Sequence, residues 1–146
     1  MKNNKLFELR EYNNLTQKDV AEILGLQRRT YTSWENGTIT IPLKHLNSLS
    51  NYYNVSMDYL LGLSKDKELN TTKKIKNLDK KEIGQRLNKI RKENNLTLRD
   101  LAEELNTTYS TISAYELGKT LILTAFAYQI CKKYNISLDW LCGKAN

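Results

Sequence analysis

The sequence predicts an all-α protein built from two similar domains that are joined by a polar linker. One proline and six glycines among 146 residues leave little turn material, whereas a β-sandwich or barrel needs many turns. Capping residues precede several apolar stretches, as they do where helices begin. The second half of the chain also repeats the first half without a gap, which indicates two copies of one domain.

The repeat is visible in several runs of sequence. Asn13–Thr16 returns 81 positions later as Asn94–Thr97, and Tyr53–Asp58 aligns with Tyr134–Asp139 at the same offset. Further residues align in pairs: Leu6 with Leu87, Arg10 with Arg91, Ala21 with Ala102, Glu35 with Glu116, and Gly37 with Gly118. A gapless match of this length predicts two domains of about 60 residues each.

Three segments follow from the repeat: a first domain over residues 1–63, a linker over residues 64–78, and a second domain over residues 79–146. The linker is polar and charged with almost no apolar residues, which favours a flexible connection. An extended helix or a surface loop is the alternative for the same composition.

Each domain is predicted to hold five helices, several of which begin at a residue able to cap free backbone N–H groups. Thr16 with Asp19 predicts a capping box, and Ser56 predicts another helix start. Asp79 with Glu82 predicts the capping box that begins the second domain. The predicted helices cover residues 2–12, 16–24, 28–35, 42–53 and 57–61, and the second copy repeats them 81 positions later, its first helix starting at Lys80.

Charge and composition narrow the classes of function. The net charge of +7 suits a polyanionic partner, although most of the surplus lies in the linker and the second domain. Two cysteines and one histidine form no metal-binding set, so no metal and no cofactor are expected. Cys131 and Cys142 are either small buried side chains or a disulfide, and His45 is expected at the surface.

Other patterns in the sequence bear on catalysis and location. The chain shows no nucleophile motif, phosphate-binding glycine loop or paired histidine and carboxylate site, so we expect no catalytic residues and no enzyme. It shows neither a signal-peptide stretch nor a run of the ~20 apolar residues that a membrane span needs. The expected location is cytoplasmic, with no membrane partner.

Residues 16–37 have the pattern of a short helix, a tight turn and a second helix. Ala21 is small, which lets the two helices approach closely, and Gly25 can adopt the positive φ that sharpens the turn. Asn106 occupies the Gly25 position in the second copy and also tolerates a left-handed conformation. The inner face of this segment is predicted to consist of Val20, Leu24, Leu26, Tyr31 and Trp34.

This pattern resembles the helix-turn-helix of the Cro/cI phage repressor family, also called the xenobiotic-response-element type. The resemblance rests on the runs Leu15–Gln17, Ala21–Gly25, Trp34–Gly37 and Val55–Leu61. It covers nearly all of residues 5–62 and, more loosely, residues 86–143. It implies two tandem five-helix lambda-repressor-like domains and a sequence-specific transcriptional regulator that binds double-stranded DNA, with repression expected over activation.

The resemblance also implies which residues contact DNA, because the family's third helix enters the major groove with its first residues at the base edges. The implied contacts of the first domain are Gln17, Gln27, Arg28, Arg29, Thr32, Ser33 and Asn36, and those of the second are Thr108, Tyr109, Ser110 and Ala114. A solvated charged face is the alternative for Arg28 and Arg29. In the same family an arginine and a glutamate form a buried ion pair, which here implies the pairs Arg10 with Glu35 and Arg91 with Glu116.

The second copy departs from the family pattern. Its third helix holds no Arg or Lys, and Leu98 replaces Gln17, so DNA binding by the second domain is left open. The apolar run Lys119–Tyr128 is either ordinary core or an association surface. A homodimer is compatible with both interpretations. The alternative function is a protein-interaction module, or an antitoxin-like regulator whose second domain binds a protein partner.

Overall fold

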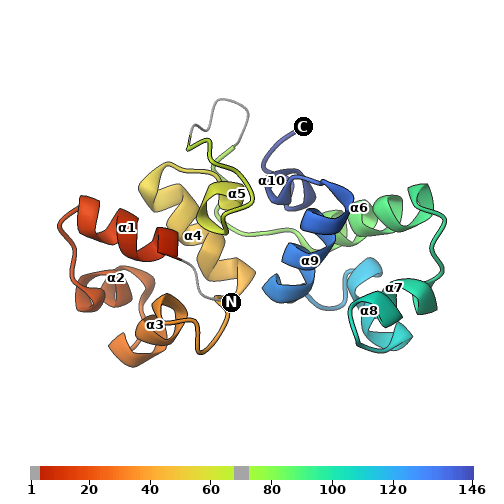
Figure 1. Cartoon of the computed structure of the whole chain (residues 1–146), viewed down its shortest axis with the longest axis horizontal. Helices are drawn as coiled ribbons and strands as arrows, with labels where there is room; N and C mark the ends of the chain where they lie inside the picture. The colour runs from red at the N-terminus through yellow and green to blue at the C-terminus, as the bar shows by residue number, and fades with distance from the viewer. Residues whose placement is uncertain (1–3, 68–72) are drawn as a thin grey trace. The chain divides into compact units, whose positions relative to one another are not determined.

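The computed structural model describes residues 4–67 and 73–146, and within these residues the regular structure consists of ten helices (Figure 1). The chain divides into two compact units, Met1–Asn70 and Thr71–Asn146, and each unit contains five of the helices. The all-α fold class is confirmed. Residues 68–72 of the predicted linker lie outside the described residues, as do residues 1–3, where the first helix is predicted to begin.

The helix bounds follow the predicted pattern closely in both units. The first unit contains α1 Asn4–Tyr12, α2 Gln17–Leu24, α3 Arg28–Glu35, α4 Leu43–Tyr53 and α5 Met57–Leu60. The second unit contains α6 Lys80–Glu93, α7 Leu98–Glu104, α8 Tyr109–Glu116, α9 Thr124–Tyr134 and α10 Leu138–Leu141. Five helices in matching order in each half are what a duplicated domain requires.

Side-chain caps begin α2 and its counterpart α7. The Thr16 hydroxyl accepts the Asp19 N–H at 3.0 Å, and the Asp19 carboxylate accepts the Thr16 N–H at 2.8 Å. Thr97 and Asp100 form the same capping box at the same two distances. These reciprocal bonds satisfy backbone donors that have no partner within the helix. The predicted box of Thr16 and Asp19 is therefore confirmed, and the repeat carries it into the second unit.

The predicted capping box of α6 is only half right. The Asp79 carboxylate accepts the N–H groups of Lys81 and Glu82, as an N-cap should. The Glu82 carboxylate, however, pairs with Arg86 at 3.0 Å, one helical turn further on. A positive partner at that spacing competes with the return bond to the cap.

The turn inside each helix-turn-helix depends on one residue with positive φ. Gly25 has φ +70° and ψ +34°, and its N–H donates to the carbonyl groups of Ala21 and Glu22. Asn106 takes the same role in the second unit with φ +56°. Both conformations are confirmed, because glycine carries no penalty there and asparagine carries a small one.

Each unit buries its own apolar core. The fully buried apolar side chains of the first unit include Leu6, Val20, Tyr31, Leu46, Leu49, Met57 and Leu60, and those of the second include Leu87, Ile112, Ala127, Leu138 and Leu141. Among the predicted inner residues, Val20, Tyr31 and Trp34 are buried, whereas Leu24 and Leu26 are half-buried. These cores fix α2 and α3, and likewise α7 and α8, in one orientation within their unit.

Two further predictions can be compared with the packing. Cys131 and Cys142 are buried free thiols, so they are small core side chains and form no disulfide. His45 is half-buried rather than exposed, because its ring lies on Trp34 with a centroid distance of 5.2 Å. Burial lowers the pKa of His45, and the nearby Lys44 lowers it further.

The apolar run Lys119–Tyr128 is core only in part. Ile122, Thr124 and Ala127 are at most 3% exposed, whereas Leu123 is 58% exposed. No helix among the described residues has the length and apolar character that crossing a membrane requires.

Candidate nucleic-acid interface

The start of α3 presents an exposed basic surface. Arg28 and Arg29 occupy its first two positions, and Gln27 directly precedes them; all three side chains are exposed. Ser33 is half-buried one turn further on, and Asn36 is exposed just after the helix. Because the guanidinium groups protrude at a helix start, they can reach a ligand without first leaving a partner in the core.

Gln17 and Thr32 hold α2 against α3. The Gln17 side-chain oxygen accepts the Thr32 hydroxyl at 2.8 Å, and its amide nitrogen donates to the Glu35 carboxylate at 3.3 Å. These polar atoms are therefore engaged within the protein. What Gln17 offers an anion is its place in the first turn of α2, where backbone N–H groups lack helical partners.

A groove beside the starts of α2 and α3 contains Lys18, a basic residue that is not among the contacts predicted from the sequence. The groove is lined by Arg10, Glu11, Asn14, Leu15, Thr16, Gln17, Lys18 and Arg28. Lys18 and Arg28 bring two positive charges to the same opening as the α2 helix start. The repeat carried a signal for Lys18, because its counterpart in the second unit is the equally basic Arg99.

Arg10 and Glu35 form a buried ion pair that joins α1 to α3. The Arg10 Nε donates to one Glu35 oxygen at 2.7 Å, and an Arg10 terminal nitrogen donates to the other at 3.1 Å. A second terminal nitrogen donates to the Leu15 carbonyl at 3.0 Å. Burial alone would raise the pKa of Glu35, but the hydrogen bonds from Arg10 and Gln17 outweigh it and hold that pKa below its ordinary value.

The second unit contains the equivalent pair. Arg91 donates to Glu116 at 2.7 Å and 3.0 Å and to the Leu96 carbonyl at 2.8 Å. In the first unit the Gln17 amide also donates to the glutamate, but Leu98 stands at the Gln17 position in the second unit. There the additional amide donor to Glu116 is Asn88 on α6, at 2.7 Å. The supporting hydrogen bond has thus moved from the second helix of the domain to the first.

The exposed face of α8 is mainly neutral, but one basic group lies beside it. Thr108 caps the helix, Ser110 is exposed, and Ala114 is half-buried. Tyr109 is 50% exposed, and the Arg99 guanidinium of α7 lies over its ring at 5.4 Å. The second unit therefore offers a cation next to α8 even though α8 itself contains none.

Comparison with known proteins places both halves in one structural family. A helix-turn-helix family model matches residues 6–60, and a second model described as a helix-turn-helix domain matches residues 84–146. Together these matches leave out residues 1–5 and 61–83.

Three bacterial relatives illustrate the similarity. The HTH-type transcriptional regulator YobD of Bacillus subtilis (strain 168) is 37% identical over 62 residues, which cover 42% of this chain and 55% of the relative. The transcriptional repressor RstR of cryptic phage CTXphi from Vibrio cholerae is 32% identical over 76 residues, 52% of this chain and 66% of the relative. The HTH-type transcriptional activator BcrR of Enterococcus faecalis is 37% identical over 60 residues, 41% of this chain and 29% of the relative. The chain spans about half the length of the first two curated relatives that it matches.

Proposed function

This chain belongs to the helix-turn-helix family through both of its halves, and from that premise we propose that it is a cytoplasmic, sequence-specific regulator of transcription that binds double-stranded DNA. The observation that carries the proposal is the pair of exposed arginines at the start of α3. These arginines lie on a helix that a buried ion pair fixes to α1. A basic helix start held rigidly by the core is suited to reading base edges, because little backbone order remains to be gained on binding.

In this mechanism α3 enters the major groove and Arg28 or Arg29 reads a guanine. A guanidinium can donate two hydrogen bonds to the O6 and N7 of guanine, which discriminates against other bases by ~1–3 kcal/mol. Lys18 and the first backbone N–H groups of α2 would meet a phosphate at the groove beside Arg28. Ser33 on α3 and Asn36 directly after it would add backbone or base contacts.

The second unit is proposed as a weaker reader. Thr108, Tyr109, Ser110 and Ala114 offer hydroxyl and methyl groups, which suit phosphates and thymine methyls, and Arg99 supplies a nearby positive charge. Because both units belong to one chain, binding by the first raises the local concentration of the second near an adjacent half-site. A homodimer would add to this effect.

The direction of regulation is proposed as repression. One relative is named a repressor and another an activator, so similarity alone leaves the sign to experiment. A binding domain that occupies a promoter blocks polymerase without further contacts, whereas activation needs an additional surface for polymerase.

A second function has one observation in its favour. Tyr109, Leu117 and Leu123 are 50%, 62% and 58% exposed, and they stand where the first unit has Arg28, Asn36 and Pro42. Exposed apolar or aromatic residues in place of the polar Arg28 and Asn36, with a further exposed leucine at the Pro42 position, favour a protein partner at the second unit.

Selection from a pool of random duplexes tests these alternatives. The full chain, the Arg28→Ala/Arg29→Ala variant and the matched Tyr109→Ala/Ser110→Ala variant are each selected and sequenced at several salt concentrations. A motif that the arginine variant loses supports reading by α3, and a two-part motif whose second part depends on Tyr109 and Ser110 supports reading by α8. If no sequence is enriched at any salt concentration, sequence-specific binding is refuted.

A further inference from the structure

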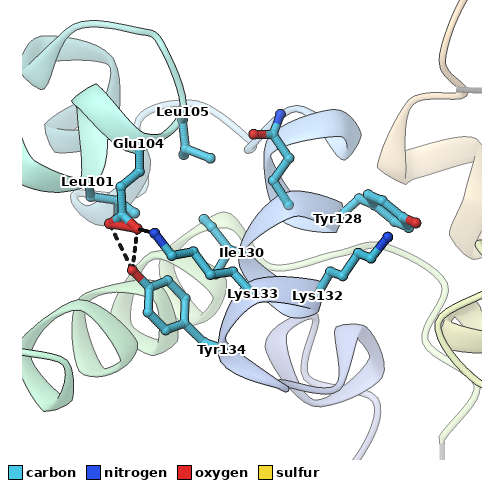
Figure 2. Close-up of a pocket in the computed structure, with 9 residues that line it drawn as sticks. Leu101, Glu104, Leu105, Tyr128, Ile130, Lys132, Lys133 and Tyr134 are labelled. Atoms are coloured by element: carbon cyan, nitrogen blue, oxygen red, sulfur yellow. Dashed lines mark hydrogen bonds and ion pairs between the residues drawn. The ribbon is translucent and has the colours of Figure 1, made fainter.

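The second unit contains a cavity between α7 and α9 that lies apart from the residues proposed to meet DNA. Its volume is about 470 Å³, which is within the range of small-molecule sites. Leu101, Leu105 and Ile130 line it and are at most 5% exposed. Figure 2 shows the polar side chains of Glu104, Lys133 and Tyr134 meeting at one side of the cavity, with Tyr128 and Lys132 at the other.

The polar side of the cavity is an ordered cluster. The Tyr134 hydroxyl donates to the Glu104 carboxylate at 2.7 Å, and the Lys133 ammonium pairs with the same carboxylate. Lys132 lies 5.8 Å from the ring of Tyr128. The carboxylate thus already accepts two donors. Among the residues that line the cavity, two ammonium groups accompany this one carboxylate, so the lining carries a net positive charge.

The first unit serves as an internal control for this cavity. At the same offset, Ile23 and Tyr52 stand in place of Glu104 and Lys133, and Asn51 stands in place of Lys132. Ile23 and Tyr52 are 44% and 50% exposed, so this part of the first unit is apolar and without a lysine. A helix-turn-helix domain therefore folds without the charged cluster, and the cluster is a property of the second unit alone.

We propose that this cavity binds a small amphipathic anion, a carboxylate or sulfonate attached to an apolar ring or short chain. The apolar part would lie against Leu101, Leu105 and Ile130, where burial of its surface supplies most of the affinity. The acid group would pair with Lys132 and lie toward Lys133, whose ammonium also pairs with Glu104. A cation would instead face two ammonium groups and a carboxylate whose oxygens are already occupied.

The test uses 8-anilinonaphthalene-1-sulfonate, an amphipathic anion, and its uncharged analogue N-phenyl-1-naphthylamine as fluorescent probes of the full chain. The sulfonate is expected to bind saturably at one site. The Lys132→Gln/Lys133→Gln variant is expected to weaken the sulfonate about tenfold and to leave the neutral probe unchanged, because a loss of that size equals ~1.4 kcal/mol of charge interaction. Circular dichroism checks that the variant is folded.

A matched variant controls for the overall charge of the chain. Lys80→Gln/Lys92→Gln removes two exposed lysines of α6 and gives the same net charge, and it is expected to bind both probes as the unaltered protein does. The proposal is overturned if the sulfonate does not saturate, if the α9 variant binds it unchanged, or if the α6 variant loses as much affinity as the α9 variant.

Discussion

Removal of Glu35 is expected to destabilise the first unit strongly, because it leaves the Arg10 guanidinium buried without its counter-charge. The two side chains are 10% and 6% exposed and share two hydrogen bonds of 2.7 Å and 3.1 Å. In Glu35→Ala the guanidinium keeps only the bond to the Leu15 carbonyl. Breaking a buried pair in this way costs about 3–5 kcal/mol. The nearest remaining carboxylate, Glu11, lies 3.8 Å from an Arg10 terminal nitrogen, but its side chain is 58% exposed and replaces little of the lost interaction.

The chain allows each unit to be followed separately, since it contains two tryptophans, Trp34 in the first unit and Trp140 in the second. A Trp140→Phe background leaves Trp34 as the only tryptophan, and it is 3% exposed. Its fluorescence during urea unfolding reports the free energy of the first unit. Glu35→Ala should lower this free energy by the stated amount, whereas Glu116→Ala should leave the Trp34 transition unchanged.

A double variant separates the ion pair from the volume of its side chains. Arg10→Met/Glu35→Leu removes both charges, so it should lose much less stability than Glu35→Ala. The reasoning is refuted if Glu35→Ala costs less than about 1 kcal/mol, the range of exposed pairs, or if the double variant is as unstable as the single one.

Three further changes are expected to have separable effects. The native pKa of Glu35 lies below its ordinary value of 4.5, so the unfolded state binds more protons than the folded state at acid pH. The contribution of the carboxylate to stability is therefore complete above pH 4.5 and is lost as the pH falls through the lowered native pKa. Glu35→Gln should flatten this pH dependence of stability in the Trp34 signal, and an unchanged slope would contradict the prediction. Gly25→Ala should lower the free energy of unfolding of the first unit by about 1–2 kcal/mol in the same assay. A Cβ at this position meets no atom within 4 Å, so the cost comes only from the left-handed φ of +70°. Increased stability would show that the turn is not left-handed. Gly84→Ala should lower the free energy of unfolding of the second unit by about 1–3 kcal/mol, because the added methyl would overlap the carbonyl oxygens of Tyr115 and Glu116. Trp140 fluorescence in a Trp34→Phe background measures this change. A neutral effect would mean that α6 and α8 are not in close contact.

The parts of the fold that depend on local sequence could be predicted. Capping boxes, the positive-φ positions and the helix bounds are set by residues within a few positions of one another, and the repeat gives each of them twice. The pairing of Arg10 with Glu35 spans 25 residues, and it was predicted only because the family resemblance supplied it.

The parts that depend on packing between distant residues could not be predicted. The stacking of His45 on Trp34 and the engagement of Gln17 by Thr32 need two helices in place before they exist. Lys144 would be expected in solvent, yet it is 1% exposed, and burial lowers its pKa while Asp139 opposes that effect. The cavity between α7 and α9 is likewise a product of tertiary structure.

The central claim is that α3 reads bases, and the most direct test measures the affinity of the full chain for a selected duplex and for its single-base variants at fixed salt. The account predicts that the unaltered protein loses ~1–3 kcal/mol at a guanine position and that Arg28→Ala or Arg29→Ala abolishes the discrimination at that position alone. Lys18→Ala, a phosphate contact in this account, should weaken all duplexes equally. If both arginine variants keep the full discrimination at every position, α3 does not read the DNA and the account is wrong.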